Sequence, residues 1–261
     1  MYYLRRNFVV WASLVLASAM SFSTMTQATD IYFSEYAEGA PYYNRYLEIY
    51  NGSDSAINIT NYALAYCLDA CATNGKWESV ELFGNTDRYP FGTRTIASGG
   101  HYVIRQNDGR VNADIKNAAD GITPNLKMSG DDPVALIRKE TNFTTDKVKA
   151  GDTSVYTVMD TIGDPVKPKS KYAVCGTTDG LSNHVLIKKE GKQGNTNWTN
   201  SRGTNTSDCD WVVKADGYYS NIGQHSPGTP PDSTAPVISL SGNQIVEVAL
   251  NGSYSDAGAT A

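Results

Sequence analysis

The chain has 261 residues, 40% of them hydrophobic, and its 22 basic and 27 acidic residues give a formal net charge of −5. This length is sufficient for a substantial domain with a core of its own. The acidic balance argues against nucleic-acid binding by this region alone, because such binding depends on Lys and Arg that neutralise phosphates.

The first 28 residues have the three-part pattern of a secretory signal peptide. Arg5 and Arg6 precede the apolar run 8–16, and small and polar residues follow as far as Ala28. We expect cleavage after Ala28, with 17–19 as a second candidate position. The apolar run is shorter than the roughly 20 residues that span a bilayer, so a retained anchor is the weaker alternative and no membrane span is expected after cleavage.

Cleavage removes both of those arginines, which leaves 20 basic against 27 acidic residues and a net charge of −7. The sequence therefore predicts a secreted or cell-surface protein, which passes through the periplasm if the cell is Gram-negative.

Short runs rich in Val, Ile, Tyr and Thr follow, separated by Gly, Asn, Asp and Pro, and no helical pattern of useful length appears. Such spacing predicts an all-β sandwich or barrel. In the alternating run 46–50 we expect Leu47 and Ile49 to face the core, together with Tyr62, and Glu48 and Tyr50 to face outward. Trp211 is large enough to fill a sandwich core, and its indole N–H then needs a partner. The expected strands are 31–36, 46–50, 62–66, 100–105, 133–138, 155–162, 184–189 and 210–213.

The composition changes near residue 229. Proline and small polar residues at 229–235 predict a linker. Residues 236–261 begin a new strand pattern but are too few for an independent sandwich. We therefore expect one domain over 29–228 and a truncated second segment over 236–261.

Several sequence pieces occur in a recognisable order: IYFSEY (31–36), NRYLEIYN (44–51), NITNY (58–62), SGGHYVI (98–104), SGDDPVAL (129–136), DTIG (160–163), VLIKK (185–189), DW (210–211) and IGQHSPG (222–228). This order resembles the bacterial extracellular lamin tail domain family, which implies an immunoglobulin-like β-sandwich. The stretches TAPVISLSG (234–242) and GSYSDAGATA (252–261) resemble the first half of a bacterial surface Ig-like repeat, a spacer. The insertion at 69–89 and the cysteines depart from the general family pattern.

Four cysteines in an exported chain predict disulfides, and four allow three pairings. We favour Cys67–Cys71 and Cys175–Cys209. The second pair closes a loop of about 35 residues, which in the chain-entropy treatment contributes about 4 kcal/mol. A zinc site is the alternative, but zinc ligands usually come as two close pairs, and Cys175 and Cys209 are far apart in sequence.

Catalytic chemistry finds little support. The histidines, candidate general bases, are His101, His184 and His225, and none of them lies in a recognisable catalytic motif. We predict no catalytic residues and no metal ligands. Calcium at the loop acids of 131–132, 179–180 and 107–109 is the alternative to an absence of cofactors, although turn chemistry also explains these sequences.

Tyrosine is unusually frequent, with 17 Tyr against 6 Phe. Tyrosine provides contact area at low entropic cost, so we consider Tyr42, Tyr43 and Tyr218 a candidate binding surface for an extracellular protein or polysaccharide. Strand propensity is the alternative explanation. A candidate basic patch of Lys167, Lys169, Lys171, Lys188, Lys189 and Lys192 is more simply explained by solvated strand ends and loops.

Two functions remain open. The first is a non-catalytic recognition or spacer module. The second is the N-terminal accessory part of a secreted hydrolase, a nuclease or phosphatase, whose catalytic domain lies beyond residue 261; the resemblance implies this one, because lamin tail domains often accompany such enzymes.

Overall fold

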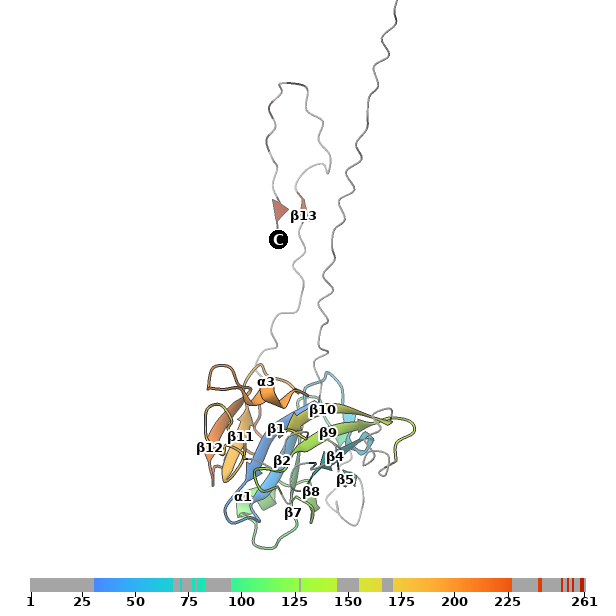
Figure 1. Ribbon diagram of the computed structural model, residues 1–261. Coiled ribbons are helices and arrows are strands. Elements are labelled where there is room, and N and C mark those ends of the chain that lie inside the picture. Colours follow the sequence, from blue (N-terminus) through green and yellow to red (C-terminus); the bar gives the residue numbers. More distant parts are fainter. Residues whose placement is uncertain are drawn as a thin grey trace, which may run out of the picture.

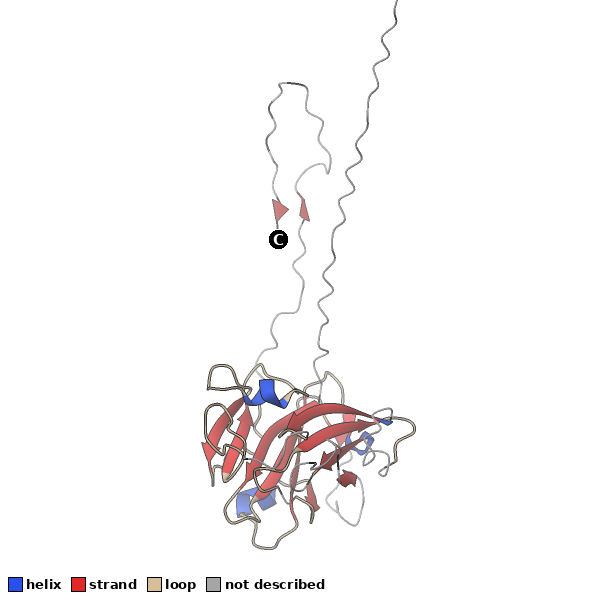
Figure 2. Cartoon of the chain, in the orientation of Figure 1, coloured by secondary structure: helices blue, strands red, loops and turns tan. Residues whose placement is uncertain are grey.

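The computed structural model shows two β-sheets packed face to face, the all-β sandwich class expected from the sequence (Figures 1 and 2). The predicted signal peptide (1–28) and linker (229–235) lie outside the residues that it describes. No helix in the described part of the chain is long and apolar enough to cross a membrane. The described residues are 31–67, 71, 77, 79–82, 95–126, 128–144, 155–165, 171–226, 239–240, 250, 253, 255 and 259–260.

The larger sheet has the strand order β12-β11-β1-β2-β7-β8. Its neighbouring strands are antiparallel except β7 and β8, which run parallel because the chain returns between them through the short helix α1 (Ala113–Ala118). The strands are β1 (Ile31–Glu38), β2 (Arg45–Asn51), β7 (His101–Gln106), β8 (Gly121–Thr123), β11 (His184–Lys188) and β12 (Trp211–Ala215).

The smaller sheet is antiparallel and has the order β10-β9-β4-β5. Its strands are β4 (Tyr62–Tyr66), β5 (Ser79–Leu82), β9 (Val134–Lys139) and β10 (Tyr156–Ile162). Each strand range predicted from the sequence overlaps a strand of one of these two sheets. The remaining elements are the pair β3 (Ile57–Asn58) and β6 (Thr95–Ile96), the pair β13 (Ser239–Leu240) and β14 (Ala259–Thr260), the 3-10 helix η1 (Ile59–Asn61) and the helix α3 (Trp198–Arg202).

The main hydrophobic core lies between the two sheets. Leu47, Ile49 and Tyr62 belong to it, as their alternation along the strands indicates. Trp211, at the start of β12, is one of its largest side chains, and its indole Nε1 donates a hydrogen bond to Ser201 Oγ at 2.9 Å. Burial of each large apolar side chain contributes about 1.5–3 kcal/mol.

A buried ion pair joins the sheets where β1 and β10 each carry a bulge. Lys188 Nζ lies 3.2 Å from Asp160 Oδ2, and neither side chain is exposed. The ammonium also lies 3.8 Å from the centroid of the Trp211 ring. Asp160 Oδ2 accepts a further bond from Phe33 N at 3.0 Å. Lys188 is therefore a core residue, which corrects its placement in a solvated basic patch.

The opposite face of the larger sheet is covered as well, which corrects a second expectation. Glu48 and Tyr50 do point away from the main core, but both are buried. Helix α1 and residues 216–226, which follow β12, lie over this face. Ile115 of α1 and Tyr219 belong to the small apolar cluster there.

Candidate functional site

Two tyrosines occupy the loop between β1 and β2. The loop is closed by its own backbone, since Gly39 N donates to Asn44 O at 3.1 Å and Asn44 N donates to Pro41 O at 2.9 Å. Tyr42 is 56% exposed and Tyr43 is half-buried. Their ring centroids lie 5.7 Å apart with 69° between the ring planes, an edge-to-face arrangement. The loop therefore presents two aromatic rings in a defined geometry.

Arg110 lies over both rings, although it comes from the turn before α1. Its Cζ is 4.6 Å from the Tyr43 centroid and 5.7 Å from the Tyr42 centroid, and its Nη2 donates to the Tyr42 hydroxyl at 2.9 Å. Asp108 accepts two bonds from the same guanidinium, at 3.0 and 2.8 Å. These bonds hold the pKa of the Asp108 carboxyl at about 2, so the partner of Arg110 stays charged.

Tyr218 lies on a second loop, which contacts the first. The residue is 38% exposed, and Lys214 Nζ lies 5.1 Å from the centroid of its ring. Ala40 N donates to Asp216 Oδ2 at 3.1 Å, and the Tyr219 hydroxyl donates to Asp216 Oδ1 at 2.9 Å. Asp216 thus joins the loop of Tyr218 to the loop of Tyr42 and Tyr43.

We call this set the tyrosine surface: Tyr42, Tyr43, Arg110, Lys214 and Tyr218. The structure places the three tyrosines expected from the sequence on adjoining loops. It adds two cations that sequence reasoning missed. No local signal indicated Arg110, which is 68 positions from Tyr42, whereas Lys214 lies close to Tyr218 in the sequence.

A second polar group, also missed from the sequence, lies beneath residues 216–226. Glu35 and Glu48 face each other across β1 and β2, and both are 0% exposed. Tyr46 donates its hydroxyl to Glu35 Oε2 at 2.7 Å, Asn221 donates its amide to Glu35 Oε1, and Gly223 N donates to Glu48 Oε2 at 2.5 Å. Burial, and then the charge of Glu48, raises the pKa of Glu35 to about 7.

One of the three histidines, His101, adjoins these acids, and a second, His225, adjoins His101. His101 Nε2 lies 3.8 Å from Glu48 Oε1 and 3.2 Å from His225 O, and the ring of Tyr50 lies against both imidazoles. Burial lowers the pKa of His101, and lowers that of His225 to about 4. The third, His184, begins β11 and bonds through Nδ1 to Ser182 O at 2.6 Å.

These acids and imidazoles hold distant parts of the chain together. Both carboxylates are enclosed, and their hydrogen bonds fasten the segment after β12 to the sheet. Ser34 Oγ donates to Glu48 Oε1 at 2.7 Å, so this hydroxyl is part of the same enclosed network.

The acidic loops considered for calcium have partners within the protein. Ser129 Oγ donates to Asp131 Oδ1 at 2.7 Å and to Asp132 Oδ2 at 2.8 Å. Asp179 lies 3.7 Å from Lys171, while the acid of 107–109 binds Arg110. Within the described ranges, no group of three or more His, Cys, Asp or Glu side chains is placed to hold a metal ion.

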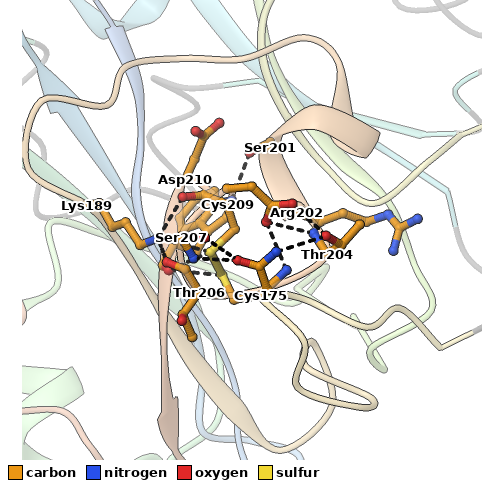
Figure 3. Close-up of a disulfide and its surroundings, with 12 residues drawn as sticks. Cys175, Lys189, Ser201, Arg202, Thr204, Thr206, Ser207, Cys209 and Asp210 are labelled. Atoms are coloured by element: carbon orange, nitrogen blue, oxygen red, sulfur yellow. Dashed lines mark hydrogen bonds between the residues drawn. A yellow bond between two sulfur atoms is a disulfide. The ribbon is translucent and has the colours of Figure 1, made fainter.

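The four cysteines lie in two pairs at disulfide distance, in the pairing favoured from the sequence. The Cα atoms of Cys67 and Cys71 are 4.9 Å apart, and those of Cys175 and Cys209 are 5.3 Å apart. Figure 3 shows the second pair beside the end of α3, where Lys189 Nζ reaches the carbonyls of Thr206 and Cys209 at 2.7 Å. This disulfide therefore connects the chain between β10 and β11, which carries Cys175, with the chain between α3 and β12, which carries Cys209.

Residues 24–152 match the model of the Lamin Tail Domain family. The chain carries a lamin tail domain. The matched range contains β1 to β9, Tyr42, Tyr43 and Arg110, and the immunoglobulin-like fold of the family agrees with the observed sandwich. Strands β10, β11 and β12 lie beyond that range and complete the same two sheets.

One solved structure matches this lamin tail domain protein at low similarity. It is a DUF4876 family protein from Bacteroides thetaiotaomicron, 14% identical, with 79% of this chain and 75% of that chain covered at a TM-score of 0.42. No curated protein matches the chain.

Proposed function

We propose that the chain is a non-catalytic recognition module of a secreted or cell-surface protein, and that it binds a protein partner through the tyrosine surface. The arrangement of Arg110 carries this proposal. A guanidinium that is held by Asp108 and stacked over Tyr43 and Tyr42 is ready to bind before a partner arrives, so little side-chain entropy is lost on binding.

The residue types also support a protein partner. Tyr and Arg are enriched among the residues that dominate protein–protein binding energy. A tyrosine that is 56% exposed beside a fixed guanidinium provides both apolar contact and directional hydrogen bonding.

A non-catalytic role is supported by the use of the acids. The carboxylates of Glu35 and Glu48 are enclosed, and their oxygens accept bonds from Asn221 and Gly223 of the covering segment. A general base must reach the proton that it removes, and these groups lie under another part of the chain. The paired cysteines support export, because disulfides persist in oxidising compartments.

Site-specific photocrosslinking in intact cells tests the binding claim. A p-benzoylphenylalanine is placed at Tyr42, at Tyr218 or, as a control, at Arg138, an exposed residue of β9. We expect positions 42 and 218 to crosslink to the same protein and position 138 not to do so. Equal crosslinking from all three positions contradicts the proposal. A complete lack of crosslinking also contradicts it and leaves the spacer role.

Turnover assays on the purified chain test the other half of the proposal. The substrates are DNA, RNA, phosphoesters and polysaccharides, each with calcium, magnesium and zinc. We expect no turnover. Activity that survives repurification and is lost in Glu48→Gln or His101→Gln shows that the enclosed cluster is an active site.

A further inference from the structure

The Lys188–Asp160 pair brings an amine and a carboxyl group together inside the core. Lys188 Nζ donates to Asp160 Oδ2 at 3.2 Å, and neither side chain is exposed. The acid comes from β10 of the smaller sheet and the lysine from β11 of the larger sheet (Figure 1). Two groups that a fold holds in contact react far faster than the same groups free in solution. The pair is therefore placed for a covalent bond between the sheets as well as for an ionic one.

The ammonium of Lys188 has more donors than the core offers acceptors. An ammonium carries three N–H donors, and Lys188 Nζ has one hydrogen-bond acceptor, Asp160 Oδ2, in the described part of the chain. The face of Trp211 lies against it as well, with the ring centroid 3.8 Å away. Buried polar groups in folded proteins are nearly always satisfied. An amide nitrogen at this position would carry a single N–H, so a covalent bond removes the excess of donors.

The surroundings of the pair also allow the amine to lose its charge. The rings of Trp211 and Tyr32, at 3.8 and 6.0 Å from Nζ, favour the ammonium. Burial disfavours both charges, however, and raises the pKa of the Asp160 carboxyl. Transfer of one proton along the Nζ–Oδ2 hydrogen bond gives a neutral amine and a neutral carboxylic acid as a minor state of the pair. A neutral lysine in an apolar pocket is a nucleophile.

The second oxygen of the carboxyl group already faces two backbone donors. Asp160 Oδ1 accepts hydrogen bonds from Thr161 N and Asn195 N, both at 2.9 Å. When an amine adds to the carboxyl carbon, negative charge develops on this oxygen. Two fixed N–H groups at such distances stabilise that charge in the way of an oxyanion hole. The fold thus supplies the proximity and the electrostatic stabilisation that amide formation needs.

We propose that Lys188 and Asp160 form an isopeptide bond, an amide between their side chains. The Nζ–Cγ bond forms and the Cγ–Oδ2 bond breaks. The ammonium gives one proton to Oδ2 before the addition and a second as the C–O bond breaks, so Oδ2 leaves as water and one hydrogen stays on the amide nitrogen. The ammonium and the carboxylate together contain every atom of the amide and the water, and the reaction needs no oxidant or cofactor.

This bond would interlock with the Cys175–Cys209 disulfide. Cys175 lies between the two joined residues in the sequence, and Lys188 lies between the two cysteines. Strands β10 and β11 and the chain before β12 would then be connected by two bonds, of which a reducing agent breaks only one. The proposal concerns core residues and no member of the tyrosine surface, so either proposal can fail while the other holds.

Mass spectrometry of the purified full chain, reduced and denatured, tests the proposal. We expect its mass to be lower, by one water molecule, than the mass given by its sequence and its measured N-terminus. Trypsin should cleave after Lys189 but not after Lys188. The peptide that contains Lys188 should be joined to the peptide that contains Asp160, and fragmentation of the joined species should place the link at these two residues.

Two variants separate the covalent bond from the ion pair. Lys188→Arg keeps a cation opposite Asp160, but a guanidinium stays protonated and does not attack the carboxyl group, so this variant should have the full mass. Lys189→Met is the matched control and should keep the joined peptides, because Lys189 bonds to loop carbonyls. If Lys188→Arg does not fold, as judged by its melting curve, the joined peptides of the unaltered chain decide the question.

A full mass for the unaltered chain, together with tryptic cleavage after Lys188, overturns the proposal and leaves the ion pair. Loss of one water without joined peptides overturns it as well. Such a loss is expected from a succinimide at an Asp-Gly step such as 108–109 or 179–180, and it would persist in Lys188→Arg.

Discussion

Glu35 and Glu48 lie directly opposite each other on β1 and β2, and neither side chain is exposed to solvent. Glu35 is bonded to Asn221 and Glu48 to Gly223, two positions in the segment that follows β12. Like charges opposite each other on neighbouring strands repel. The repulsion is unfavourable, but the hydrogen bonds of the two acids hold residues 216–226 against the sheet.

Replacement of Glu35 by Gln should change how stability depends on pH. The pKa of Glu35 is about 7 in the fold, against 4.5 in the unfolded chain, so the folded state holds this proton more tightly. Its contribution to the free energy of unfolding therefore decreases as pH rises from about 4.5 to about 7, by at most about 3 kcal/mol. Urea unfolding at a series of pH values should show that the free energy of unfolding of Glu35→Gln increases relative to that of wild type as pH rises through this window.

The other groups of the cluster titrate in both directions, so the difference between the two proteins is the quantity to measure. Burial lowers the pKa of His101 and His225, whose contributions increase as pH rises, and raises that of Glu48 and Asp120. The contributions of groups that do not interact with Glu35 largely cancel when the variant is compared with wild type, whereas that of Glu48 changes with the loss of its charged neighbour. Stability curves that stay parallel from pH 4.5 to 8 contradict the assignment of Glu35.

Lys188→Met should be strongly destabilising, by about 3–5 kcal/mol, because it leaves the enclosed Asp160 without its cation. The neighbouring Lys189 provides the control. Its ammonium bonds to loop carbonyls rather than to a buried acid, so Lys189→Met should cost less. Urea unfolding of both variants makes the comparison, and a Lys188→Met protein as stable as the Lys189→Met protein refutes the buried pair.

The two disulfides should differ in their contribution to stability. Cys175 and Cys209 are 34 positions apart and Cys67 and Cys71 only 4, so loop closure predicts about 4 kcal/mol for the first and about 2 for the second. Thermal unfolding of the two Cys→Ser double variants measures the difference. Mass spectrometry that finds free thiols at Cys175 and Cys209 in exported protein rules out the bond itself.

Export predicts a defined N-terminus. The order of charged, apolar and small residues in 1–28 places cleavage after Ala28, so the exported protein should begin at Thr29. N-terminal sequencing of protein recovered outside the cytoplasm provides the measurement. A start at Met1 removes the argument for an oxidising compartment.

The strands could be predicted from the sequence because their signals are local. The alternation of 46–50 indicates which residues face the core, and Leu47 and Ile49 do so. The short helices α1 and α3 could not be predicted in this way, because six and five residues are too few to show a helical period. Their Asn caps, Asn112 and Asn197, are the local signal that was available.

The errors came from contacts between distant parts of the chain. Glu48 alternates like an exposed residue, but residues 216–226 return to cover it. The sequence places Lys188 at the end of a strand, where a lysine usually reaches solvent. In the fold its ammonium is buried and pairs with Asp160 of the other sheet. The tyrosines of the candidate surface were found by composition, whereas Arg110 became visible only when the turn before α1 was placed beside Tyr43.

The central claim is that the tyrosine surface binds a partner, and Arg110 is its most direct test. A p-benzoylphenylalanine at Tyr218 reports partner contact in intact cells, in chains that also carry Arg110→Ala or Arg138→Ala. Both arginines are exposed and ion-paired, to Asp108 and Glu140, so they are matched in kind. We expect Arg110→Ala to reduce the crosslink at least about tenfold, as for a residue that dominates binding, and Arg138→Ala to leave it unchanged. Equal yields in the two chains contradict it.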